Sequence, residues 1–307
     1  MLTITVGRTD EDYTTIQEAL NAIPYNTEAE IIISEGIYRE KLFSDKKSLS
    51  IRGEGNVTIS WNDFGYDILD RNRKRGTFRS YTAFFSGEYL KLENLTIENT
   101  AGEGSKVGQG IALYLDTEKS LIKNVRLSGH QDTLFLSPLP DEEREKYGFY
   151  GPRYLLPRKR TTSLFKSCSI EGSIDFIFGG GDALFDGCRI ICNDNGYVTA
   201  PSGRKEWIGF IFNNCTFESA LDGITSYLMR PWRKEGKASF LSCDIGSFIT
   251  GSGLSAWPGL DSELDQCTYR LSCCNTVNQI DSSYIADESS IRKDISYILN
   301  ELKYFLS

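Results

Sequence analysis

The sequence contains a single histidine, His130, and no Cys-x-x-Cys pair among its eight cysteines. A single histidine excludes a His-rich metal site, and a Cys–His nucleophile would have to use this residue, which no cysteine neighbours in sequence. The absence of a Gly-x-Ser-x-Gly elbow argues against a serine esterase of the α/β-hydrolase type. The chain also lacks a P-loop and a dinucleotide-binding fingerprint, so nucleotide chemistry is not indicated.

Long apolar runs are missing as well. No stretch approaches the roughly 20 residues that span a bilayer, so we expect no membrane partner. The first residues show no basic segment followed by an apolar one, so no signal peptide is visible. The compartment is therefore left open, with an intracellular location slightly favoured over secretion. A net charge of −8 argues against a nucleic-acid partner.

The remaining composition is that of an ordinary globular protein. The chain has 307 residues, of which 40% are hydrophobic and 25% are charged, enough for a sizeable core. Most cysteines sit inside strand-like segments, which favours buried thiols that act as small hydrophobes over a disulfide framework.

A short pattern repeats along the chain: an apolar residue, two polar or small ones, then Leu, Val or Cys, a polar residue and another apolar one. Its fourth position falls at residues 95, 125, 168, 188, 215 and 243. Repeats of 20–50 residues without intervening helices indicate a solenoid. We predict an all-β, single-stranded right-handed parallel β-helix with an inward cysteine stack, and Asn or Gly in its tight turns. A jelly roll or another β-sandwich is the alternative.

Three segments lie outside the repeat. A first strand at 3–6 is followed by a short helix with Ile16, Ala19, Leu20 and Ile23 at helical spacing, ending at Pro24. Residues 137–160 are rich in proline and charge, and removing these 24 residues from the longest interval leaves 19, one normal turn. The tail from about 285 to 307 predicts a helix that packs on the solenoid, with capping of its open end as one arrangement.

One carboxylate stands among apolar residues in the segment 170–180. Alternation places Ile174, Phe176 and Phe178 on one strand face, with Asp175 on the other. Once residues 137–160 are set aside, Asp132 precedes Asp175 by 19 residues, so the two would occupy adjacent rungs about 4.8 Å apart. Two carboxylates that close ionise unequally, so one can act as an acid while the other is a base or nucleophile.

Other polar residues could complete such a site. Arg230 beside one aspartate would hold it ionised, and Trp232 offers a flat face for a sugar ring. Gln109 and Gln131 could donate hydrogen bonds to a developing oxyanion. Asp132 shares strand parity with two leucines, so a turn or bulge at 129–132 must direct it outward.

Four motifs in order resemble the pectin methylesterase (pectinesterase) family. They are GQGIAL at 108–113, GHQDTLF at 129–135, SIDFIFG at 173–179 and YLMRPW at 227–232. DYTTIQEAL, GTFRS, NLTIENTAG and YVTAPSG also match, and the resemblance runs from about residue 4 to about 258. It implies a right-handed parallel β-helix, here one domain over 1–307, that removes methyl esters from galacturonate units of pectin.

The resemblance also implies a role for each matched residue. Asp175 would be the nucleophile, Asp132 the general acid and then base, and Gln131 with Gln109 would stabilise the oxyanion. Arg230 would bind Asp175, and the substrate contacts would be Thr77, Gln109, Phe178, Arg230 and Trp232. No metal or cofactor is implied. The partner would be methyl-esterified homogalacturonan or oligogalacturonides, and we expect a monomer.

Some features depart from the family or leave its function open. Met229 replaces a glycine and would narrow the groove beside Trp232. The Gly-Pro-Arg insertion within 137–160 is similar to bacterial members; the loop would overhang the cleft, and Arg153, Arg158, Lys159 and Arg160 would meet free carboxylates. Residues 260–280 are unassigned. Two alternatives stay open: a galacturonan hydrolase or lyase on the same fold, and a non-catalytic β-helix that binds polysaccharide.

Overall fold

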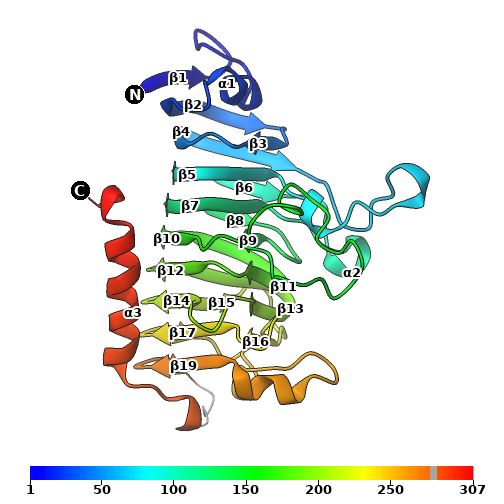
Figure 1. Ribbon diagram of the computed structural model, residues 1–307, viewed down its shortest axis with the longest axis vertical. Coiled ribbons are helices and arrows are strands. Elements are labelled where there is room, and N and C mark those ends of the chain that lie inside the picture. The colour runs from blue at the N-terminus through cyan, green and yellow to red at the C-terminus, as the bar shows by residue number, and fades with distance from the viewer. Residues whose placement is uncertain (277–281, 307) are drawn as a thin grey trace.

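The chain winds into a coil of parallel strands. The computed structural model describes residues 1–276 and 282–306 (Figure 1). The strands of the first half are β1 (Leu2–Val6), β2 (Glu28–Tyr38), β3 (Leu42–Ser44), β4 (Ser48–Trp61), β5 (Ala83–Glu93), β6 (Thr96–Asn99), β7 (Leu113–Lys123), β8 (Arg126–Ser128) and β9 (Leu134–Leu136). Those of the second half are β10 (Thr162–Lys166), β11 (Ser169–Gly179), β12 (Asp182–Asp186), β13 (Arg189–Pro201), β14 (Phe210–Asn213), β15 (Thr216–Ser219), β16 (Ser226–Met229), β17 (Lys237–Leu241), β18 (Asp244–Ile245), β19 (Thr268–Ser272) and β20 (Asn275–Thr276).

Helices are few and short. They are α1 (Ile16–Ala22), α2 (Gly104–Val107) and α3 (Glu288–Glu301), with 3-10 turns at Asp70–Asn72, Thr77–Arg79, Asp261–Gln266, Ser282–Tyr284 and Lys303–Phe305. The predicted N-terminal helix is confirmed: Thr15 caps α1 by accepting from the Glu18 amide, and its apolar face packs over the first rungs. Within the described residues no helix is both long and apolar enough to cross a membrane.

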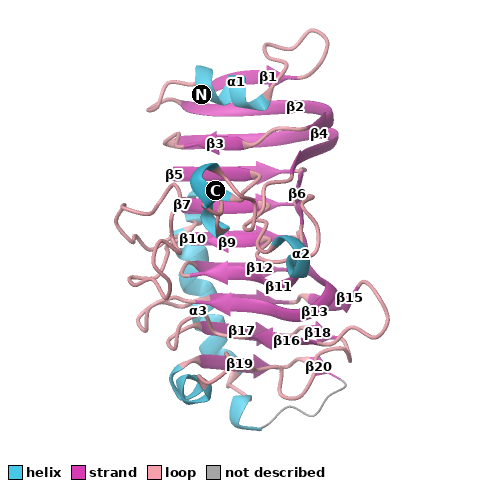
Figure 2. Ribbon diagram, turned by 90° about the vertical axis from the view of Figure 1, so that its right-hand side faces the viewer, coloured by secondary structure: helices cyan, strands magenta, loops and turns pink. Residues whose placement is uncertain are grey.

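Successive rungs stack in register, as the repeat predicted. Thr96, Arg126, Ser169, Arg189, Thr216, Asp244 and Asn275 pair one after another along one ladder. The residue before each ladder position therefore stacks as well, and Leu95, Val125, Cys168, Cys188, Cys215 and Cys243 are all buried. Figure 2 shows the rungs edge on. The parallel β-helix is confirmed, while its right-handed winding stays a prediction.

The residue two places before this ladder position has left-handed backbone in seven successive rungs. Its φ lies between 52° and 55° at Asn94, Asn124, Ser167, Asn214, Ser242 and Cys273, and is 61° at Gly187. Asparagine tolerates this left-handed region better than other residues with side chains because its amide bonds locally. The prediction that Asn and Gly occupy the tight turns holds for four of these seven rungs, and Ser or Cys takes the position in the other three. The cysteines are free thiols in the described residues, also as predicted.

The repeat continues one rung beyond the stretch that the sequence pattern covered. Cys274 precedes Asn275 in the ladder, and β19 and β20 supply this rung from the segment left unassigned at 260–280. Residues 277–280 of that segment lie outside the described residues. A second ladder stacks Phe165, Phe185, Phe212 and Phe240 inside the coil, with ring centroids 4.6–5.1 Å apart.

The C-terminal helix lies along the flank of the coil and not across its end. Ile291, Ile298 and Leu302 pack on outward-facing residues of five stacked strands: Leu121, Leu164, Leu184, Ile211 and Leu241. Figure 1 shows α3 running alongside β10 to β19. The apolar face of this helix was predicted correctly, but capping of the open end was wrong because the matching apolar stripe is on the flank.

Candidate active site

Asp132 and Asp175 lie on neighbouring rungs. Leu134 pairs with Ile177, and the Asp132 amide donates to the Ile174 carbonyl at 3.0 Å, so the two aspartates occupy equivalent places on consecutive turns. The rung arithmetic is therefore confirmed. Both side chains line one cleft of about 260 Å³.

Both aspartates sit on left-handed backbone, with φ of 67° at Asp132 and 50° at Asp175. Asp132 belongs to a turn before β9, which turns its side chain outward as the sequence required. At Asp175 the pairing register of β11 shifts between Ile174 and Ile177. Non-glycine residues held in this region cost free energy, and such backbone strain is concentrated at functional sites.

This bulge corrects the predicted strand faces. Phe176 and Ile177 both enter the inner core, whereas Phe178 faces outward into a second apolar cluster. Strict alternation, which grouped Phe176 with Phe178, is wrong because the shift inserts a residue into the period-two pattern.

Arg230 holds Asp175 through a bidentate ion pair. Its Nε donates to Oδ1 at 3.2 Å and its Nη2 donates to Oδ2 at 2.6 Å. The guanidinium lies between two rings, with its central carbon 3.6 Å from the centroid of Tyr197 and 3.8 Å from that of Trp257. Two hydrogen bonds and two stacked faces fix both the charge and the orientation of the Asp175 carboxylate.

The sequence reasoning missed the roles of Tyr197 and Trp257. Tyr197 is the first residue of the YVTAPSG motif, and Trp257 lies at the end of the segment that resembles the family. Neither position indicated a contact with Arg230. Their stacking on Arg230 depends on rungs 33 and 27 residues away, which no local pattern reports.

The two carboxyls differ in how readily they ionise. Burial raises the pKa of Asp175 above its ordinary value, and the Arg230 guanidinium opposes this shift. Burial and then the negative charge of Asp175 raise the pKa of Asp132 well above its ordinary value, with Arg230 offsetting part of the effect. Asp175 therefore loses its proton first, and Asp132 keeps its proton beside it.

The cleft gathers the other predicted residues. Thr77, Gln109, Gln131, Phe178 and Trp232 line it with the two aspartates, and Arg230 lies behind Asp175. The Gly110 amide donates to the Gln131 carbonyl at 3.0 Å, so the two glutamines stand on adjacent rungs. These placements agree with the predicted constellation, while the roles of the residues stay predictions.

An aromatic cluster outside the coil forms the wall of the cleft. Its buried members are Phe78, Tyr81, Phe84, Ile111, Tyr114, Phe135, Leu139, Phe149, Phe178 and Ala200, with Tyr154 and Trp232 packed against them. The Trp232 ring lies 5.7 Å from that of Phe149 and 6.3 Å from that of Phe78, measured between centroids. Trp232 is thus held by residues from two long loops, neither of which carries a repeat signal.

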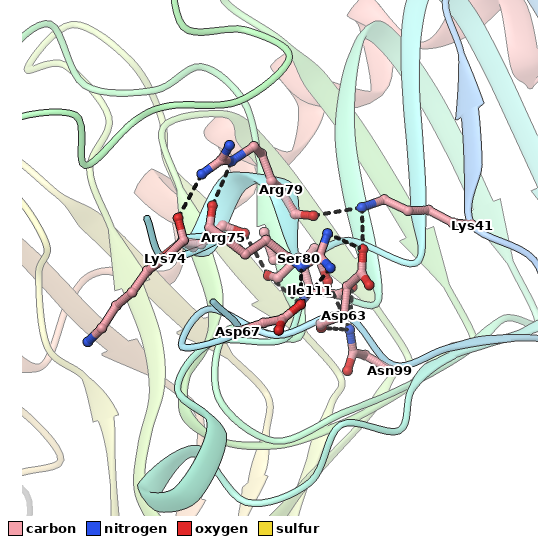
Figure 3. Close-up of polar contacts among 10 residues, drawn as sticks. Lys41, Asp63, Asp67, Lys74, Arg75, Arg79, Ser80, Asn99 and Ile111 are labelled. Carbon is pink, nitrogen blue, oxygen red and sulfur yellow. Dashed lines mark hydrogen bonds and ion pairs between the residues drawn. The ribbon is translucent and has the colours of Figure 1, made fainter. Parts of the chain in front are cut away.

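The first of these loops, residues 62–80, is here called the arm. Asp63 anchors it by accepting from Lys41 at 2.5 Å and pairing with Arg75 at 2.9 Å. The Asn99 amide donates to the Asp63 and Ser80 carbonyls, both at 2.9 Å (Figure 3). This network fixes both ends of the arm and so seats Thr77 in the cleft.

The second loop, residues 137–160, overhangs the cleft as predicted. Arg144, Glu145, Gly148 and Phe149 contribute to its lining. The four cations of this loop that were predicted to meet free carboxylates are not among these lining residues.

Arg153, Arg158, Lys159 and Arg160 do not line the cleft, which corrects that expectation. Arg153 pairs with Asp116 at 2.8 Å, Lys159 with Glu118 at 2.9 Å, and Arg160 with Asp182 at 2.5 Å. Arg158 donates to backbone carbonyls of its own loop. These cations tie the loop to the coil.

Met229 also differs from its predicted place. It is fully buried in the inner core and does not reach the groove beside Trp232. Because Met229 precedes Arg230 at the end of β16, its side chain points inward when Arg230 points outward.

The chain is similar in sequence and in fold to known pectinesterases. The pectinesterase family model matches residues 3–139 and 156–280. Pectinesterase 31 of Arabidopsis thaliana is 31% identical over 274 residues, covering 85% of this chain and 79% of the relative. The probable pectinesterase/pectinesterase inhibitor 64 of the same plant is 28% identical over 286 residues, and this chain spans only 42% of its length. The solved structure of pectin methylesterase PemA from Erwinia chrysanthemi has a TM-score of 0.77 at 22% identity, covering 97% of this chain and 96% of that one. The chain belongs to the pectinesterase family.

Proposed function

We propose that the cleft hydrolyses methyl esters of galacturonate units in pectin, with Asp175 as nucleophile and Asp132 as general acid and base. The observation that carries this proposal is the pairing of an Arg230-bound Asp175 with a second buried carboxyl that holds its proton. One carboxylate is ready to attack, and its neighbour is ready to donate.

The first half-reaction makes an acyl-enzyme. A carboxylate oxygen of Asp175 attacks the ester carbonyl carbon, and the carbonyl electrons move to its oxygen. Gln131 and Gln109 donate hydrogen bonds to this oxyanion. When the oxyanion collapses, the bond to the methoxy group breaks, Asp132 gives its proton to the departing oxygen, and methanol leaves an anhydride on Asp175.

The second half-reaction returns both residues to their starting state. Asp132, now a carboxylate, removes a proton from water as the water attacks the carbonyl carbon of the galacturonate in the anhydride. Collapse of this intermediate breaks the bond to Asp175 and releases galacturonic acid, whose new carboxyl group then loses its proton to solvent. Asp132 is protonated again, and no cofactor enters the scheme.

The apolar wall suits the sugar chain. Trp232 and Phe178 line the cleft with aromatic rings that can contact the C–H faces of the sugar rings, and Thr77 adds a hydroxyl. We place the methylated homogalacturonan chain along this wall, with one ester carbonyl over Asp175.

Finer aspects of the proposal rest on the sequence. The Gly151-Pro152-Arg153 insertion in the overhanging loop supports a bacterial type of pectinesterase, and the family resemblance supports a right-handed coil. An intracellular location and a monomeric state stay predictions from sequence.

Product analysis separates this function from its alternatives. Incubation with methylated pectin should release methanol while the polymer keeps its length and no ultraviolet-absorbing unsaturated product forms. Shortened chains would indicate a hydrolase and unsaturated ends a lyase. Binding of pectin without any methanol release would indicate a non-catalytic protein.

A further inference from the structure

The two glutamines of the cleft have no polar partner that would orient their carboxamides. Gln109 and Gln131 line the cleft, and within residues 1–276 and 282–306 neither side chain makes a hydrogen bond to the protein. Both are only partly buried. A long, freely rotating side chain loses entropy when a reaction has to fix it. Packing must therefore set the direction of each carboxamide.

A buried glycine lies against the end of each carboxamide. Gly65 of the arm faces Gln109, and Gly104, the first residue of α2, faces Gln131. A methyl group at residue 65 would lie 2.4 Å from Gln109 Oε1, and one at residue 104 would lie 2.6 Å from Gln131 Oε1. Both distances are well inside the roughly 3.5 Å of an ordinary non-bonded contact. Each carboxamide therefore occupies the space that a side chain at the glycine would fill.

The atom that faces the glycine is Oε1 in both glutamines. Because Oε1 and Nε2 diverge from the same carbon, the Nε2 of each glutamine points away from its glycine. A developing oxyanion needs N–H donors and is repelled by a carbonyl oxygen. The orientation that the two glycines permit is thus the one that the reaction requires.

The arm is bound to the segment that carries Gln109. The Gly65 amide donates to the Gln109 carbonyl at 2.7 Å, and the Tyr66 amide donates to the Val107 carbonyl at 3.0 Å. The Gly65 carbonyl also accepts from the Gly76 amide at 3.0 Å. These bonds hold the backbone of Gly65 against Gln109, so the carboxamide packs on a fixed surface.

Gly104 is held by the short helix α2. The Gly108 amide donates to the Gly104 carbonyl at 2.8 Å, which closes this single turn. A methyl group at residue 104 would also lie 2.7 Å from Gln131 Cβ, an atom that cannot move without the backbone. A side chain at residue 104 would therefore shift the turn that carries Gln131 and Asp132, whereas one at residue 65 would displace chiefly the Gln109 carboxamide.

We propose that Gly65 and Gly104 are positioning residues, which act through Gln109 and Gln131 to present two N–H donors to the oxyanion. The inference rests on the proposed function and adds two residues that carry no functional group of their own. A displacement of about 1 Å in a catalytic constellation can cost about 100-fold in rate. A single added methyl group at either glycine is therefore enough to slow the reaction.

The test measures kcat and KM for methanol release from methylated oligogalacturonates. Gln109→Ala should lower kcat about 100-fold, because one oxyanion donor is removed. Gly65→Ala should lower kcat about tenfold or more and leave KM within about twofold, because the oxyanion forms only as the reaction proceeds. Gly104→Ala should lower kcat at least as far, since it also shifts Asp132. Gly65→Ala/Gln109→Ala should match Gln109→Ala within about twofold, because alanine at residue 109 leaves no carboxamide to displace.

Gly7→Ala is the matched control. A methyl group at residue 7 would lie 2.1 Å from Glu11 Oε1, so it also displaces the end of a flexible side chain, but neither residue lines the cleft. The control should keep the wild-type kcat, and circular dichroism checks that every variant is folded. A wild-type kcat in Gly65→Ala or Gln109→Ala, an equal loss in Gly7→Ala, or losses that multiply in the double variant would overturn the proposal.

A spectroscopic readout separates this proposal from the proposed function. The Nε2–H₂ resonances of Gln109 in the ¹⁵N-labelled protein are assigned by their loss in Gln109→Ala and need no turnover. They should shift in Gly65→Ala and stay unchanged in Gly7→Ala. If they shift in this way while the wild type releases no methanol, the proposed function fails and positioning by Gly65 is supported. Gln109 resonances that do not move in Gly65→Ala contradict the positioning itself.

Discussion

Asp132 and Asp175 are each less than a tenth exposed, and each stands on backbone that residues with side chains rarely adopt. Removing a carboxylate from water costs free energy unless partners compensate. Asp175 has Arg230 as its partner, whereas Asp132 avoids the cost by keeping its proton. The same environment that makes Asp132 an acid therefore lowers the stability of the fold wherever the pH forces it to ionise.

Replacing Asp132 by Asn should stabilise the protein at alkaline pH. A carboxyl whose folded-state pKa exceeds its unfolded value contributes a stability that is lost as pH rises from about 4 through the folded-state pKa. Asn cannot ionise, so each unit of pKa elevation returns about 1.4 kcal/mol of unfolding free energy at high pH. Urea unfolding at pH 4 and pH 8 measures this, with the exposed Asp222→Asn as control. A gain that is no larger at pH 8 than at pH 4 would contradict the pKa direction.

Arg230→Gln should move the acidic limb of the kcat/KM profile to higher pH. The guanidinium opposes the effect of burial on the pKa of Asp175, so its loss raises that pKa and leaves less ionised nucleophile at low pH. We also expect kcat to fall about 100-fold as the orienting hydrogen bonds are lost. Arg230→Lys keeps a positive charge but not the bidentate pair, so the acidic limb of its kcat/KM profile should move less. Superimposable pH profiles for Arg230→Gln and the wild type would exclude the role of Arg230 in keeping Asp175 ionised.

For individual residues, the sequence predicted which side chains lie close together but not the direction in which each one points. Motifs and rung arithmetic brought Asp132, Asp175 and Arg230 together. The bulge at Asp175 was not predictable from hydrophobic alternation, because a single inserted residue moves Phe176 and Phe178 to opposite faces. Tyr197 and Trp257 were missed because stacking on Arg230 is decided between rungs, not within one.

Among the structural elements, the turn before the stacked ladder is the unit that sets the repeat. Asn94, Asn124 and Asn214 hold the same left-handed conformation in different rungs. The repeated residue types made this turn predictable, because few side chains tolerate positive φ. The same local logic allowed the inward position of the cysteines to be predicted.

Asn214→Ala should destabilise the protein by about 1–2 kcal/mol, because alanine meets the full steric cost of left-handed backbone. Asn214→Gly is the matched comparison, since glycine adopts φ of 52° without that cost. Chemical denaturation of both variants measures the difference. Alanine and glycine variants of equal stability would show that backbone strain does not decide this position.

Elements outside the repeat were harder to predict. The apolar face of α3 was visible from its spacing, yet its partner surface is a stripe contributed by five strands far apart in sequence. Likewise, the arm and the overhanging loop meet only in space, through contacts such as Phe78 with Phe149, whose ring centroids lie 5.8 Å apart. The composition of residues 137–160, rich in proline and charge, predicted a loop that leaves the coil. It carried no information on which cations of this loop face the cleft.

Over the whole molecule, the coil is a scaffold that carries the cleft on one side. Its ladders fix the spacing of the rungs that carry Asp132 and Asp175, and two long loops from different turns contribute to the aromatic wall beside them. The aspartate pair and this wall line one cleft, which is where we place the polymer chain.

The measurement that tests this account most directly is methanol release from methylated pectin by wild type, Asp175→Asn and Asp116→Asn. Asp116 is the matched control because it is also a buried aspartate paired with an arginine, but it lies outside the cleft lining. Asp175→Asn should lose about 10⁴-fold or more in kcat because the amide cannot form the acyl-enzyme, whereas Asp116→Asn should keep most of its activity. A folded Asp175→Asn protein that releases methanol at more than about one hundredth of the wild-type rate would contradict the assignment of Asp175 as the nucleophile.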